Sequence, residues 1–83
     1  MTRKAIFKAL ATALVAEGFR DFEGKSLSYT TRYNEVTVSL DRGCISVVQR
    51  CYPMKEGWCM KDFKKTKRGI SAVVKFAKAN MTA

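Results

Sequence analysis

The stretch that decides the fold spans residues 26–50 and reads SLSYTTRYNEVTVSLDRGCISVVQR. Apolar and polar side chains alternate over residues 26–33 and again over residues 35–40, which is the period of a strand with one buried face. Residues 44–50 are rich in β-branched side chains, which also favour a strand. The turn-forming residues between these segments are Asn34 and then Asp41, Arg42 and Gly43. The pattern predicts three antiparallel strands joined by short turns.

A helix is predicted before this stretch. Thr2 is a suitable N-cap, residues 3–17 show helical periodicity, and Gly18 ends the helix. The apolar side chains that share one face are Ile6, Phe7, Leu10, Ala13 and Leu14. This stripe is wide for so small a protein, so we expect either the sheet or a second copy of the chain to cover it. A homodimer through the first helix is therefore one hypothesis.

The flanking segments are less regular. Residues 19–25 fit either a short first strand or an ordered loop, and residues 58–63 fit a fourth, shorter strand. A last helix follows Thr66, which is a suitable N-cap. Its apolar residues at helical spacing are Ile70, Val73, Val74 and Ala77. Gly69 weakens the first turn by about 1 kcal/mol relative to alanine, so we expect the helix to start nearer Ile70 or Ser71.

The order of elements is α-β-β-β(-β)-α. This order predicts an α+β fold, in which helices pack on one face of an antiparallel sheet. The chain has 83 residues, which is too few for two independent cores, so we expect residues 1–83 to form a single domain. Hydrophobic residues make up 47% of the chain, and this share argues against intrinsic disorder.

The composition excludes several classes of enzyme. The chain has no histidine, which removes His-based acid–base catalysis and most zinc sites. The triplet Glu23-Gly24-Lys25 has the E-x-K form of metal-dependent nucleases but lacks an upstream strand aspartate, so a charged turn is favoured. We expect a protein without enzymatic activity, metal or cofactor.

The cysteines bear on the cellular compartment. Cys44, Cys51 and Cys59 have no C-x-x-C spacing, and their number is odd. Packed free thiols are favoured over a disulfide, a metal site or a reactive thiol, which fits a reducing compartment. No segment approaches the roughly 18 apolar residues of a membrane span, and residues 9–16 fit a helix better than a signal peptide. We therefore expect a cytoplasmic protein with no membrane contact.

The positive charge is concentrated near the carboxyl end. The net charge is +9, and residues 51–83 carry eight basic and two acidic side chains. Lysine and arginine release counterions when they bind phosphates, and a helix N-terminus offers unpaired N–H groups to the same anion. The expected contact residues are Lys61, Lys64, Lys65, Lys67, Arg68, Lys75 and Lys78. Tyr52 and Trp58 flank a turn beside Lys55, and stacking of these two rings on a nucleic-acid base is a further hypothesis.

We therefore expect a small basic protein that binds nucleic acid, either RNA or DNA, through charge. The alternative comes from a different class, the small regulators or inhibitors found among accessory proteins of phages and mobile elements. Such a protein would dock on an acidic surface of a larger protein. A third interpretation of the basic cluster is a solvated face that only keeps the protein soluble.

The order of elements and two short motifs resemble two known families. The α-β-β-β-α order and the run Lys64-Lys65-Thr66-Lys67-Arg68 resemble double-stranded RNA-binding domains. That resemblance implies that these basic residues meet phosphates across the major groove. The same order, with a first helix ending in Glu17-Gly18-Phe19, is similar to small mRNA-cleaving toxins of the HicA kind. Those toxins depend on a strand histidine, so the resemblance implies a non-catalytic relative.

Overall fold

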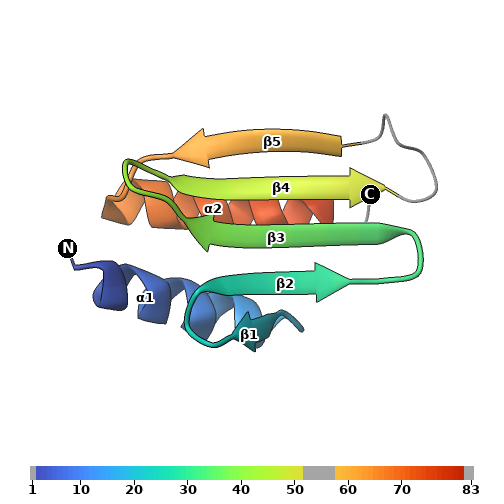
Figure 1. The fold of residues 1–83 in the computed structure, drawn as a ribbon, viewed down its shortest axis with the longest axis horizontal. Helices are drawn as coiled ribbons and strands as arrows, with labels where there is room; N and C mark the ends of the chain where they lie inside the picture. Colours follow the sequence, from blue (N-terminus) through green and yellow to red (C-terminus); the bar gives the residue numbers. More distant parts are fainter. Residues whose placement is uncertain (1, 52–57, 82–83) are drawn as a thin grey trace.

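The part of the chain that the structure describes forms five strands and two helices (Figure 1). The computed structural model describes residues 2–51 and 58–81. In chain order the elements are α1 (Arg3–Val15), β1 (Arg20–Phe22), β2 (Ser26–Thr30), β3 (Asn34–Leu40), β4 (Ile45–Cys51), β5 (Trp58–Phe63) and α2 (Lys67–Asn80). The strands form one antiparallel sheet in the order β1-β2-β3-β4-β5. The predicted α+β fold is confirmed.

Both helices cover the same face of the sheet. Figure 1 shows α1 behind β1 and β2, and α2 behind the strands that follow them. Strand register brings Val38 opposite Val47 and Leu40 opposite Ile45, so their side chains reach the helices together. The buried helix residues that meet them are Ile6, Phe7, Leu10 and Leu14 of α1 and Val73 and Ala77 of α2.

The apolar stripe of α1 is therefore covered within one chain. Ile6, Leu10 and Leu14 are at most 1% exposed, and each such side chain contributes roughly 1.5–3 kcal/mol on burial. The homodimer hypothesis rested on this stripe, and its burial removes that support. Dimerisation stays a prediction for sedimentation to test.

The segment before β2 contains both a strand and a turn. β1 pairs with β2, and the Lys25 N–H donates to the Phe22 carbonyl at 2.9 Å. Glu23 and Gly24 between them have φ of 56° and 69°, the pair of left-handed conformations that a tight hairpin turn requires. The E-x-K triplet thus lies in a charged turn.

Strand β2 ends three residues earlier than predicted. The Thr31 hydroxyl accepts from the Asn34 N–H at 3.1 Å, and the Thr31 N–H donates to the Asn34 carbonyl at 2.7 Å, which closes a turn. Tyr33 is consequently 60% exposed, and the Arg32 guanidinium lies over its ring at 5.5 Å from the centroid.

Helix α2 begins at Lys67, earlier than predicted, with Thr66 as its N-cap and Gly69 inside its first turn. The Thr66 hydroxyl accepts from the Gly69 N–H at 3.0 Å, and the Thr66 carbonyl accepts from the Ile70 N–H at 2.8 Å. A Cβ atom at residue 69 would overlap the carbonyl oxygen of Lys64. The missing side chain therefore lets the chain turn directly from β5 into the helix.

The other end of α2 is held by a buried amide. Asn34 is 2% exposed, and its Nδ2 donates to the carbonyls of Asn80 at 2.7 Å and Met81 at 3.3 Å. Its Oδ1 accepts from Gln49 Nε2 at 2.7 Å. These bonds satisfy carbonyls that the helix end would otherwise leave unpaired, and they fix the end of α2 against β3 and β4. Within the described ranges, neither helix is long and apolar enough to cross a membrane.

Replacing Gly69 with alanine is expected to destabilise the protein by about 2 kcal/mol or more, because the added Cβ displaces the Lys64 carbonyl. At an ordinary helix position the same replacement stabilises by about 1 kcal/mol. Urea denaturation followed by circular dichroism measures the difference. Ser71→Ala, at an exposed position of the same helix, is the matched control and should not lower stability. A Gly69→Ala variant as stable as the parent would contradict this account.

The Asn34→Leu variant is expected to lose about 3 kcal/mol, since it leaves the carbonyls at the end of α2 without their buried donor. Thermal unfolding at several guanidinium concentrations measures the loss. Thr37→Val changes a side chain of the same strand on the uncovered face and should alter stability little. Equal stability of the two variants would show that the Asn34 amide does not hold the helix.

Candidate functional site

The two helices point in the same direction, so their N-termini lie at one end of the molecule, beside the turn between β3 and β4 (Figure 1). The first turn of α1 contains Arg3 and Lys4, and that of α2 contains Lys67 and Arg68. Neither first turn contains an acidic residue. A helix N-terminus is the positive end of the backbone dipole, so four cations here oppose the dipole and leave the region attractive to anions.

The β3–β4 turn connects the two helix ends. Arg3 Nη1 donates to the Leu40 carbonyl at 3.2 Å, and Lys65 Nζ donates to the Arg42 carbonyl at 3.3 Å. The accepting residues are two positions apart, so the start of α1 and the segment before α2 are fixed to the same turn. We call this region the basic end, and it consists of Arg3, Lys4, Arg42, Lys64, Lys65, Lys67 and Arg68.

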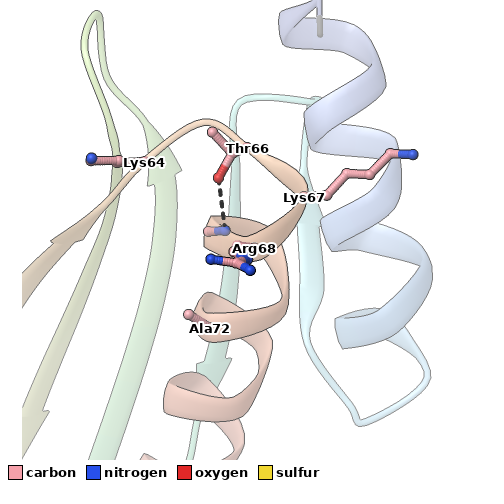
Figure 2. A pocket seen from close by; sticks show the side chains of 6 residues that line it. Lys64, Thr66, Lys67, Arg68 and Ala72 are labelled. Carbon is pink, nitrogen blue, oxygen red and sulfur yellow. Dashed lines mark hydrogen bonds between the residues drawn. The ribbon is translucent and has the colours of Figure 1, made fainter.

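A shallow groove of about 590 Å³ opens at the start of α2. Its lining residues are Lys64, Thr66, Lys67, Arg68, Gly69 and Ala72. Figure 2 shows Lys64 and Lys67 pointing away from one another, with Arg68 between them and the Thr66 hydroxyl bonded to the Gly69 N–H. Within residues 2–51 and 58–81, none of the three basic side chains forms an ion pair with a carboxylate. Their charges are therefore available to an external anion.

The structure divides the predicted contact residues. Lys64, Lys65, Lys67 and Arg68 gather at the basic end, whereas Lys75 is exposed further along α2. The Lys61 ammonium lies 5.4 Å from the ring centroids of both Phe63 and Phe76, a cation–π arrangement at the β5 edge. Lys78 pairs with Glu17 at 3.2 Å, about 16 Å along the helix from Lys67. Lys78 is thus partly neutralised and remote from the cluster.

The predicted stacking residues are not placed by the structure. Tyr52 lies outside the described residues, and Trp58 begins β5 but its side chain is likewise outside them. Stacking by these rings stays a prediction.

Three members of the basic end were missed in the sequence. Arg3 and Lys4 are remote from the lysine cluster in sequence, and Arg42 stands between the turn-forming residues Asp41 and Gly43. The signal that could have found them is the number of strands. An odd number of antiparallel strands between two helices makes the helices run in the same direction, which brings both N-termini to one end.

Cys44, in the β3–β4 turn, is a free thiol near the basic end. Partial burial raises its pKa above the ordinary value for a thiol, and the carboxylates of Asp62 and Asp41 raise it further, against a smaller opposing effect of Lys65. A raised pKa keeps the thiol protonated near neutral pH. Within the described residues, no three cysteine or carboxylate side chains are grouped to hold a metal ion.

No family model, curated protein or solved structure matches this chain. The resemblance to double-stranded RNA-binding domains was based on an α-β-β-β-α order with three strands, whereas the sheet has five strands. That resemblance is therefore restricted to the general order of elements and to the basic residues that begin α2.

Alkylation of Cys44 by iodoacetamide is expected to be slow at neutral pH and to rise at a higher pH than for an unfolded cysteine. Peptide mapping by mass spectrometry separates Cys44 from the other two cysteines. Asp62→Asn should move the rise to lower pH, because it removes a neighbouring negative charge. Asp21→Asn, outside the β3–β4 turn, is the control and should leave the profile unchanged. Unchanged profiles in both variants would contradict the assigned electrostatic cause.

Proposed function

We propose that this protein binds nucleic acid through the basic end, without catalysing a reaction on it. The observation that carries the proposal is the placement of two basic helix N-termini at one end of the molecule. Each terminus offers unpaired N–H groups together with cationic side chains, the combination that binds phosphate. Two such termini joined by one turn fit a ligand with repeated phosphates better than a single anion.

The cations at the helix N-termini lower the stability of the fold, and this loss also supports an anionic ligand. Each exposed cation at a helix N-terminus interacts unfavourably with the dipole and lowers the stability of the helix by about 0.3–1 kcal/mol. Lys67 and Arg68 are exposed, and no carboxylate of the described residues pairs with either of them. The negative charge of an anionic ligand offsets this repulsion, because it attracts both the cations and the positive end of the dipole. Release of the ligand's counterions favours binding further.

Non-catalytic binding is proposed from the composition of the chain and from the residues of the groove. No histidine is present to act as a base near neutral pH. Among the described residues, no carboxylate lines the groove at α2 beside Lys64, Lys67 and Arg68. We place the protein in the cytoplasm, since a chain with an odd number of cysteines suits a reducing compartment.

The triple variant Lys64→Gln, Lys67→Gln, Arg68→Gln is expected to bind nucleic acid more weakly and with less dependence on salt. For duplex DNA, the slope of log K against log salt concentration should become shallower by about 2 to 3. Fluorescence anisotropy with labelled duplex and single-stranded probes measures both quantities. Removal of Lys67 and Arg68 should leave the fold intact, because their charges oppose the helix dipole.

The matched control is the triple variant Arg20→Gln, Arg32→Gln, Arg50→Gln. It lowers the net charge by the same three units but lies outside the basic end. Equal losses in the two triple variants would show that total charge, and not this surface, determines binding. If the parent binds no nucleic acid but retains a stoichiometric acidic protein in a pulldown, the proposal is wrong and the regulator alternative is favoured.

A further inference from the structure

A second groove lies between the first half of α1 and the turn that joins β1 to β2. Its volume is about 590 Å³, within the range of roughly 300–1,000 Å³ that is usual for small-molecule sites. Arg3 belongs both to this groove and to the basic end, because its guanidinium also donates to the Leu40 carbonyl. The groove is therefore continuous with the proposed binding surface.

The walls of this groove combine three kinds of chemistry. Phe7, which is 9% exposed, and Ala11 form an apolar surface one helical turn apart. Arg3, Lys4 and Lys8 provide positive charge along α1. Asp21 contributes a carboxylate from β1, on the opposite wall.

The Asp21 carboxylate is held in position by the hairpin turn. Its Oδ1 accepts from the Gly24 N–H at 2.8 Å, and the turn that supplies this N–H has positive φ at Glu23 and Gly24. Among the described residues, no basic side chain lies within ion-pair distance of Asp21. The carboxylate is thus an ordered acceptor that faces the groove without being neutralised by the cations of α1.

These features define the class of ligand. A simple anion would use the cations but would be repelled by Asp21, and a fatty acid has no donor for the carboxylate. A nucleotide whose base carries an exocyclic amino group satisfies all three walls. Its phosphate meets the cations, its ring contacts Phe7 and Ala11, and its amino group donates to Asp21, as carboxylates accept from cytosine N4.

We propose that this groove takes one unpaired, amino-bearing base of a strand bound at the basic end. The base is unpaired because pairing occupies the amino group and stacking encloses the ring. Uracil and thymine lack the exocyclic amine and present carbonyl oxygens on either side of their N–H, which a carboxylate disfavours. This inference rests on the proposed function and adds to it a preference for cytosine-containing single strands over uracil-containing ones.

The experiment compares oligo(C) and oligo(U) RNA of equal length by fluorescence anisotropy, with an RNA duplex as the third probe. The parent protein is expected to prefer oligo(C) by about tenfold, the size of a specific base contact. Asp21→Asn should abolish this preference, since the neutral amide no longer favours a donor. Glu23→Gln is the matched control, because it removes an equal charge from the turn directly after β1 but does not line the groove.

A second variant tests the space itself. Ala11→Leu fills the groove and should weaken binding of oligo(C) while leaving duplex binding unchanged. Thr12→Leu adds a similar side chain at the next, exposed position of α1. This variant should change neither oligo(C) binding nor duplex binding.

The failures of the two proposals are distinguishable. Equal binding of oligo(C) and oligo(U) by the parent, with duplex binding intact, would overturn the base groove alone. A parent protein that binds none of the three probes would overturn the proposed function and the base groove with it.

Discussion

The carbonyl oxygen of Lys64 occupies the space that a side chain at residue 69 would need, and the position of α2 depends on this contact. Because residue 69 is glycine, the chain turns from β5 into α2 within three residues, and Thr66 caps the helix as it does so. The first turn of α2 is therefore fixed to the end of the sheet. Lys65 then reaches the β3–β4 turn, which Arg3 contacts from α1.

The fold stabilises an arrangement that electrostatics alone disfavours. Basic residues crowd both helix N-termini, where the backbone dipole repels them. The stability that this loses is offset elsewhere, by the apolar core between helices and sheet and by the buried Asn34 at the far end of α2. Under the proposed function, the two helices fix the backbone positions of Arg3, Lys4, Lys67 and Arg68 before a ligand binds, so less backbone entropy is lost on binding.

Much of the fold could be predicted from alternation and periodicity, because one face of each strand and helix is buried. The N-cap of α2, Thr66, could also be predicted from the sequence. The pattern of residues 19–25 fits both a strand and a loop, because the three-residue β1 has no buried side chain and forms through pairing with β2. Unless β1 is counted, it is not known whether the number of strands is odd or even. The sequence therefore does not show that the two helices run in the same direction, which brings Arg3 and Lys4 to the same end as the lysine cluster. The requirement for Gly69 was also invisible, because it depends on a backbone atom five residues away.

The opposed ends of α2 have a practical consequence for anyone attaching this protein to a surface. The helix is about 21 Å long, so the chain leaves it far from the seven cations of the basic end. A tether joined beyond the end of α2 would hold the molecule by the end opposite these cations and present them to solution. A tag joined before Thr2 would instead lie among them, and an acidic tag there would compete with any polyanion for the same charges.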